Sequence, residues 1–206
     1  MVRCVIIGAV EISNYSRIKS YLRPDDFYIC CDGGLDHAEN LGIKPNLIIG
    51  DFDSHEKPQT KIETIQLPCE KDDTDSFYAC KEAIRRGFND FLLLGVIGQR
   101  FDHSLVNISL LLYLQKEGKK ALLIDDYSEM QLVGTDPVQI PDSFSYFSLL
   151  CVAGDVSGVT IKNAKYPIEN AAIQTSYQYA CSNEVLPGKT ALVNVKKGIL
   201  LLIKIY

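Results

Sequence analysis

The sequence predicts an α/β fold, with a mainly parallel sheet in the N-terminal domain and an antiparallel β-sandwich as the C-terminal domain. Three observations support this prediction. Short continuous apolar runs alternate with amphipathic stretches up to Ile124, which is typical of βαβ units. From Tyr127 the pattern changes to short β-rich runs divided by Gly, Pro, Asn and Asp. The length of 206 residues fits one large domain or two small ones.

The first half contains five apolar runs that predict strands covered on both faces, because they are continuous rather than alternating. These runs are Val2–Gly8, Phe27–Cys31, Leu47–Gly50, Phe91–Leu94 and Ala121–Ile124. Apolar residues at helical spacing predict a helix over Asp75–Arg86, which ends at Gly87. A second helix is predicted over Asp102–Gly118, and we expect it to be substantially buried because it is apolar nearly all round.

The second half predicts strands without a convincing helix. The β-rich runs are Val138–Ile140, Phe144–Cys151, Val159–Ile161, Thr190–Val195 and Ile199–Tyr206. Lys196-Lys197-Gly198 predicts a hairpin turn that pairs the last two runs. We therefore expect two domains, residues 1–127 and 128–206. The second is so small that it should lean on the first domain or on another subunit.

Composition and charge exclude several classes of function. The net charge is −5 and the isoelectric point is about 5.2, so nonspecific binding to nucleic acid or to a membrane surface is not expected. The N-terminal apolar run is too short for a signal peptide, and no run reaches the ~20 residues of a spanning helix. The seven cysteines form no CxxC pair and predict reduced buried thiols. We expect a cytoplasmic protein.

A pair of aspartates follows the third apolar run, in the sequence LIIGDFDS over Leu47–Ser54. Side chains two residues apart point to one face of an extended segment, so Asp51 and Asp53 would converge just past a strand. Ligands bind at this edge of open α/β sheets. Neighbouring carboxylates repel each other, and a divalent cation such as Mg²⁺ relieves the repulsion. A solvated turn is the alternative.

A second acidic cluster, Glu70–Asp75, precedes the first predicted helix. Asp73 or Thr74 is suited to cap that helix, and a carboxylate at Asp75 suits the positive end of the helix dipole. Capping leaves the concentration of negative charge around Lys71 unexplained. A carboxylate at Asp75 that faces a metal ion, with Lys71 reaching a phosphate, would account for both signs of charge.

Two glycine-containing turns also follow predicted strands. In Gly95–His103, Arg100 offers a planar grip on phosphate beside a helix N-terminus, although Asp102 is equally suited to be a simple N-cap. In Cys31–Gly34, Gly33 and Gly34 would let the backbone approach a ligand beside Asp32. Because parallel strands end at one edge of a sheet, all these motifs should meet there. Together they predict a metal-assisted phosphate site without a Walker loop.

The order of these motifs resembles the thiamine pyrophosphokinase family, from about Asp32 to the end of the chain. The motifs are DGG, PNLIIGDFDS, KDDTD, GxxGQRFDHSLVN, and YP and SN in the tail. The resemblance implies an enzyme that transfers the pyrophosphoryl group of ATP to the hydroxyl of thiamine, giving thiamine diphosphate and AMP. It also implies Mg²⁺ as cofactor and a homodimer, whose thiamine site lies between the α/β domain of one subunit and the β domain of the other.

The resemblance also implies roles for individual residues. Asp51, Asp53 and Asp75 match the metal-site aspartates, with Asp32, Gly33 and Gly34 beside them. Lys71, Asp72 and Thr74 match the motif near the triphosphate, Arg100, Asp102 and Asn107 match the third motif, and Ser182 and Asn183 match the tail motif that contacts thiamine. The resemblance thus implies that the nucleotide is bound by Asp32, Gly33, Gly34, Lys71, Thr74, Arg100 and Asn107. Gln99 stands where the family usually has a second glycine, and residues 163–167 match only loosely.

The expected catalytic residues are Asp72, Asp75, Arg100 and Asp102. Positioning and neutralisation of charge carry most of such a transfer. Either Asp102 or Asp72 would accept the proton of the thiamine hydroxyl, and the sequence does not choose between them. Two alternatives remain: a phosphohydrolase with an aspartate nucleophile, and a non-catalytic sensor that binds a nucleotide or thiamine.

Overall fold

The computed structural model describes residues 2–52, 59–70 and 72–206. The chain divides into two compact units, one ending at Asp126 and the other beginning at Tyr127. Each unit contains its own apolar core cluster. The predicted fold class, an α/β part followed by antiparallel β structure, is confirmed.

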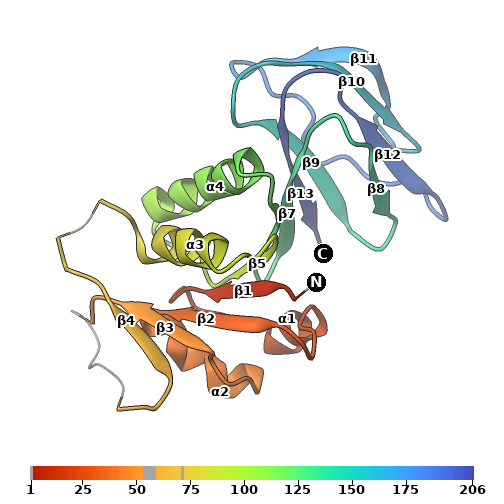
Figure 1. Cartoon of the computed structure of the whole chain (residues 1–206). Helices are drawn as coiled ribbons and strands as arrows, with labels where there is room; N and C mark the ends of the chain where they lie inside the picture. Colours follow the sequence, from red (N-terminus) through yellow and green to blue (C-terminus); the bar gives the residue numbers. More distant parts are fainter. Residues whose placement is uncertain (1, 53–58, 71) are drawn as a thin grey trace. The chain divides into compact units, whose positions relative to one another are not determined.

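The first unit is built on a parallel sheet (Figure 1). Its described strands lie in the order β4-β3-β2-β1-β5-β6, and every neighbouring pair is parallel. The strands are β1 (Cys4–Ile7), β2 (Phe27–Cys31), β3 (Leu47–Gly50), β4 (Glu63–Gln66), β5 (Asp90–Leu94) and β6 (Lys120–Ile124). β1 and β3 are buried along their whole length, as continuous apolar runs predict.

Helices cover both faces of this sheet. Figure 1 shows α3 (Asp75–Arg85) and α4 (Phe101–Lys116) on one face, and α1 (Tyr15–Ser20) and α2 (His37–Leu41) on the other. A short 3₁₀ helix, η1 (Asp32–Asp36), connects β2 to α2. Ile18 of α1 and Leu41 of α2 pack in one core cluster with alternate residues of β1, β2 and β5. The burial prediction for α4 is confirmed for its C-terminal half and wrong for its N-terminal half.

The exposed part of α4 is its N-terminal half. Phe101 is 72% exposed and Leu105 is 53% exposed, whereas Leu110, Leu111 and Leu114 are buried. A helix that packs against one sheet face buries only one stripe, so apolar side chains on the opposite side remain in solvent whatever their hydrophobicity.

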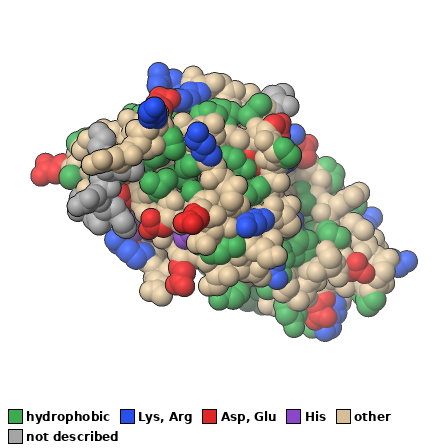
Figure 2. Space-filling view, turned by 90° about the horizontal axis from the view of Figure 1, so that it is seen from below, with side chains coloured by type: hydrophobic (Ala, Val, Ile, Leu, Met, Phe, Trp, Pro, Cys, Tyr) green, Lys and Arg blue, Asp and Glu red, His purple; other side chains and the backbone are tan. Residues whose placement is uncertain are grey.

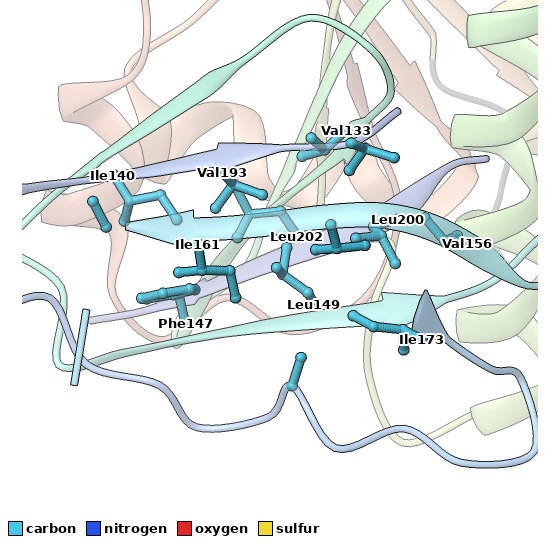
Figure 3. Packing of buried hydrophobic residues seen from close by; sticks show 14 of the residues in the cluster. Val133, Ile140, Phe147, Leu149, Val156, Ile161, Ile173, Val193, Leu200 and Leu202 are labelled. Atoms are coloured by element: carbon cyan, nitrogen blue, oxygen red, sulfur yellow. The ribbon is translucent and has the colours of Figure 1, made fainter. Parts of the chain in front are cut away.

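The second unit is an antiparallel sandwich. Its strands form two antiparallel groups, one in the order β7-β13-β9 and the other, a four-stranded sheet, in the order β11-β10-β12-β8. The strands are β7 (Ser128–Val133), β8 (Val138–Pro141), β9 (Tyr146–Cys151), β10 (Val156–Lys162), β11 (Ile168–Ile173), β12 (Thr190–Asn194) and β13 (Leu200–Ile205). Figure 3 shows their inward side chains meeting in one core, among them Phe147, Leu149, Val193 and Leu202.

The hairpin predicted at Lys196-Lys197-Gly198 is wrong. β12 pairs with β10 and β8, whereas β13 pairs with β7 and β9, so this segment carries the chain from one sheet to the other. Gly198 has a φ of 100° and lies against Val156, and Lys197 forms an isolated bridge with Ser157. A turn signal fixes a change in direction, but the partner of each strand depends on which apolar face reaches the core.

All seven cysteines are free, and Cys4, Cys30, Cys31 and Cys80 are buried within the first unit. Cys69 and Cys181 are exposed, so the prediction of buried thiols was wrong for these two. Burial raises the pKa of the Cys30 thiol to about 12, and the pKa values of the other three buried thiols are raised as well. These thiols are therefore packed as apolar groups and are weak nucleophiles in the folded protein.

The surface carries charges of both signs. On the face drawn in Figure 2, Lys and Arg side chains lie scattered among Asp and Glu side chains. Within the ranges that the structure describes, no helix is long and apolar enough to cross a membrane.

Candidate active site

The carboxyl ends of β1, β2, β3 and β5 lie side by side, so the loops that follow them share one edge of the sheet. Backbone hydrogen bonds join two of these loops, from Gly8 N to Leu94 O (2.8 Å) and from Val10 N to Gly95 O (2.9 Å). A Cβ atom added to Gly95 would lie 2.6 Å from Gly8 O. Contact this close requires glycine, and it draws the ends of β1 and β5 together.

Asp32 lies directly after β2 and begins η1 with a φ of 42°. Its Oδ1 atom is buried. A Cβ atom on Gly50 would lie 3.3 Å from this same Oδ1 atom, so the end of β3 packs directly on the Asp32 carboxylate. A Cβ atom on Gly34 would lie 2.2 Å from Ile7 O, so Gly34 seats η1 against the end of β1. Gly33 is also buried.

Asp51 follows β3 and is half-buried. The next residue, Phe52, has a φ of 57°, which is a left-handed conformation. The expectation that Asp51 and Asp53 point the same way assumed an extended backbone, and this assumption was wrong because the chain turns at Phe52. Asp53 itself lies outside the described residues, and so does Lys71.

Asp75 begins α3, and its carbonyl oxygen lies 3.7 Å from the Cys31 Sγ atom at the end of β2. Burial raises the pKa of Cys31, and the nearby Asp75 charge raises it further. Since Cys31 directly precedes Asp32, the start of α3 lies beside the end of β2. The Oδ1 atom of Asp75 is buried, like that of Asp32. Hard oxygen donors from separate segments are the groups that Mg²⁺ prefers.

The rest of the acidic cluster has structural contacts. Thr74 is the N-cap of α3, and its hydroxyl accepts a hydrogen bond from Phe77 N (3.3 Å), which confirms one of the two capping candidates. Asp73 forms an ion pair with Lys81 (2.8 Å). Asp72 is exposed.

Arg100 and Asp102 form an exposed ion pair, with 2.6 Å between the Arg100 Nη2 and Asp102 Oδ2 atoms. The hydrogen bond from Arg100, followed by one from the backbone of His103, lowers the pKa of Asp102 to about 2. The residue before the first turn of α4 is Arg100, so the alternative that Asp102 is the N-cap was wrong; Asp102 lies in the first turn. In this pairing Asp102 is a weak proton acceptor.

The loop before Arg100 contains Gln99, at the position where the family usually has a second glycine. A Cβ atom on Gly98 would lie 2.4 Å from Val10 Cγ1, so position 98 requires glycine. Gln99 is not among the described non-glycine residues with a positive φ. Its backbone is therefore open to any residue, and a side chain here imposes no conformational strain on the loop.

Asn107 is buried, and both the oxygen and the nitrogen of its side-chain amide bond to protein atoms. Its Nδ2 atom donates to Val96 O (2.8 Å), and its Oδ1 atom accepts from Ser76 Oγ (2.8 Å). Ser104 is also buried, and its hydroxyl lies 3.1 Å from Gly98 N, Gly98 O and Arg100 O. Sequence reasoning missed Ser76 and Ser104, because a serine inside a helix has no signal that separates it from an ordinary helix residue.

In the second unit, Asn183 is buried and holds the segment around Tyr166. Its side chain accepts from Tyr166 N (3.0 Å) and donates to Tyr166 O (2.8 Å). Ser182 is exposed and has a φ of 53°. Tyr166 is 58% exposed, so the YP and SN motifs form one surface whose backbone is fixed by Asn183.

The carboxylates of Asp32, Asp51 and Asp75 thus come to neighbouring strand and helix ends from three segments of the chain. Among the residues that the structure describes, no group of three or more His, Cys, Asp or Glu side chains is close enough to hold a metal ion. Asp53, the remaining member of the expected set, is not among them.

Two family models match the chain. Residues 18–123 match the thiamin pyrophosphokinase catalytic domain, and residues 137–200 match the thiamin pyrophosphokinase vitamin B1 binding domain. The first model covers more than half of the chain.

Known proteins are similar over nearly the whole length. The thiamine pyrophosphokinase of Bacillus subtilis is 29% identical over 195 residues, which is 91% of each chain. Thiamin pyrophosphokinase 1 of Caenorhabditis elegans is 26% identical and covers 92% of this chain and 84% of its own. The crystal structure of the thiamine pyrophosphokinase from Bacillus subtilis has a TM-score of 0.85 at 25% identity and covers 100% of this chain and 99% of its own.

Proposed function

The chain belongs to the thiamin pyrophosphokinase family, and on this premise we propose that it transfers the pyrophosphoryl group of ATP to the hydroxyl of thiamine. The products are thiamine diphosphate and AMP. The observation that supports the site is the placement of Asp32 after β2, Asp51 after β3 and Asp75 at the start of α3, at the sheet edge where β5 also ends before the loop to Arg100. Carboxylates for a cation and a guanidinium for phosphate are the groups this reaction needs.

The residues at this edge fit Mg²⁺. The donors are carboxylate oxygens, which suit a hard cation, and one oxygen each of Asp32 and Asp75 is buried. Asp51, Asp53 and Asp75 would hold the ion, with Asp32 beside them. When bound, Mg²⁺ would neutralise charge on the polyphosphate. Lys71 and Arg100 would bind phosphate oxygens, and Asp72 and Thr74 would lie near them.

Arg100 would exchange partners when ATP binds. Its guanidinium is exposed and paired with Asp102, and a phosphate offers the same bidentate geometry with more charge. Loss of the Arg100 hydrogen bond removes the main cause of the low pKa of Asp102. Asp102 then becomes a better acceptor for the proton of the thiamine hydroxyl. Asp72 is the alternative base.

The second unit would supply the thiamine contacts, through Ser182 and through Asn183 and the segment it fixes. We further propose a homodimer in which this surface completes the site of the partner subunit; the exposed side chains of Tyr146, Tyr166 and Leu186 would support such an interface. A cytoplasmic location is proposed from the seven free cysteines, since reduced thiols persist in a reducing compartment.

The test is a coupled measurement of both products. With Mg²⁺-ATP and thiamine, AMP and thiamine diphosphate should form in equal amounts. Release of inorganic phosphate without thiamine, with a covalent aspartyl-phosphate, would favour the phosphohydrolase. Binding of thiamine without AMP would favour the sensor.

The variant Asp75→Asn should lower kcat by about two to three orders of magnitude, because it removes a charge from the cation site. Asp73→Asn is the matched control: it changes the same residue type two positions away, where the carboxylate pairs with Lys81. Its kcat should stay within about twofold of the parent. Equal loss in both variants would reject the assignment of Asp75.

A further inference from the structure

We infer that Ser76 and Asn107 form a buried positioning pair that holds the start of α3 and the loop before Arg100 in one fixed arrangement. The inference rests on the proposed function, because these two segments carry Asp75 and Arg100. It changes the role expected for Asn107 from a contact with the nucleotide to a contact between two parts of the site.

The hydrogen bonds form a continuous chain through the protein. The Ser76 hydroxyl donates to Asn107 Oδ1 at 2.8 Å, and Asn107 Nδ2 donates to Val96 O at 2.8 Å. The Ser76 Oγ atom also lies 3.2 Å from Thr74 Oγ1, and Thr74 Oγ1 accepts a hydrogen bond from Phe77 N. The chain therefore runs from the cap of α3, through the body of α4, to the loop that follows β5.

Burial strengthens these hydrogen bonds. Ser76 is 9% exposed and Asn107 is 6% exposed, so water cannot replace a lost partner. An unsatisfied buried polar group costs more than the hydrogen bond contributes, so the two side chains strongly favour being paired. A shift of α3 relative to the loop would break the pairing, and the pairing therefore opposes that shift.

A second contact completes the arrangement on the loop side. The buried hydroxyl of Ser104 lies 3.1 Å from both Gly98 O and Arg100 O. The loop is held at Val96 by Asn107 and at its far end by Ser104, one helical turn apart on α4. Asp75, directly before Ser76, is in this way placed relative to Arg100 by the buried side chains of the pair and of Ser104.

The test compares Ser76→Ala, Asn107→Ala and the double variant, with Ser109→Ala as control. Ser109 lies on α4 like Asn107, but it is exposed and bonds only locally to Leu105 O (3.2 Å). For Ser76→Ala we expect kcat to fall roughly tenfold while the KM for thiamine stays unchanged, and the double variant should lose little more than either single variant.

Hydrogen exchange supplies a readout independent of turnover. In Ser76→Ala, the backbone amides of the 96–100 loop should exchange roughly tenfold faster, although the altered residue lies on α3. A purely local role would speed exchange only in the first turn of α3. Ser109→Ala should change neither segment.

Exchange confined to α3, or fully additive losses of kcat in the double variant, would overturn the inference. If Asn107→Ala does not fold, Ser76→Ala and its exchange pattern decide alone, because that change removes a single hydroxyl. If the parent protein makes no AMP from ATP and thiamine, the proposed function fails, whereas the exchange experiment still tests the pairing.

Discussion

Asp32, Phe52 and Ser182 have φ angles of 42°, 57° and 53°, and each lies in a motif that the sequence had singled out. A left-handed conformation costs a residue with a side chain ~1–2 kcal/mol. Such strain persists where the surrounding structure imposes it, often at ligand sites. The sequence could not show it, because a phenylalanine between two aspartates gives no sign of a positive φ. The extended backbone that the alternation argument assumed at Phe52 was wrong for this reason.

Replacement of Arg100 by Ala should raise the pKa of Asp102 from about 2 towards 3.8, because the hydrogen bond from Arg100 is the largest cause of the low value. A lowered pKa means that the ion pair contributes to stability above the unfolded pKa, and that this contribution is lost as the pH falls through the folded pKa near 2. NMR titration of the Asp102 carboxyl carbon measures the change. An unaltered pKa in Arg100→Ala would contradict the assigned cause.

Gly34 and Gly42 offer a matched pair for testing close packing at the sheet edge. A Cβ atom at Gly34 would lie 2.2 Å from Ile7 O, whereas one at Gly42 meets nothing within 4 Å and suffers only from a φ of 71°. Gly34→Ala should lower the free energy of unfolding by ~3 kcal/mol and Gly42→Ala by ~1 kcal/mol. Urea unfolding measures both. A smaller loss for Gly34→Ala would mean that η1 can move away from β1.

At the scale of elements, long apolar runs and long amphipathic helices could be predicted, since many residues contribute to each signal. β2 and β3 begin and end at the predicted residues, and α3 ends one residue early. The short helices α1 and α2 could not be predicted, because six and five residues barely complete a turn of periodicity. The β12 and β13 pairing was wrong because a local turn signal does not encode the partner of a strand.

The edge strand β4 gives a prediction at this scale. Arg86, the C-cap of α3, joins Glu63 of β4 (2.6 Å) to the buried Glu82 (2.7 Å). Among the residues that the structure describes, Arg85 pairs with Glu82 alone. Arg86→Ala should lower the free energy of unfolding by ~1–2 kcal/mol and increase amide exchange in β4. Arg85→Ala, the control, should leave β4 unchanged. Equal exchange in both variants would show that the Glu63 contact does not hold the edge.

At the scale of the whole molecule, the two units have separate cores. Phe147 is 1% exposed and lies in the sandwich core, whereas Phe101 is 72% exposed on α4. Phe147→Ala should lower the free energy of unfolding by ~3–5 kcal/mol, and Phe101→Ala should change it by less than ~0.5 kcal/mol. Denaturant unfolding compares the two. A large loss for Phe101→Ala would reveal that its exposed ring is covered in solution.

For the candidate site as a whole, the sequence could predict only which edge of the sheet carries its motifs. Parallel topology alone requires the ends of β2, β3 and β5 to lie on one side, and this could be argued from the order of the motifs. The contacts within the edge could not be predicted, because Ser76, Asn107 and Gly50 meet their partners across long stretches of sequence. Asn183 shows the same limit: its motif suggested a ligand contact, whereas its side chain binds the backbone of Tyr166.

The reactivity of the buried thiols in the first unit would measure how often the elements around them separate. Cys4, Cys30, Cys31 and Cys80 lie within neighbouring elements, and each becomes an ordinary reactive nucleophile when those elements separate. An alkylating agent would then modify these four thiols at a rate set by how often the elements separate, whereas the exposed Cys69 and Cys181 would react in the folded protein as well.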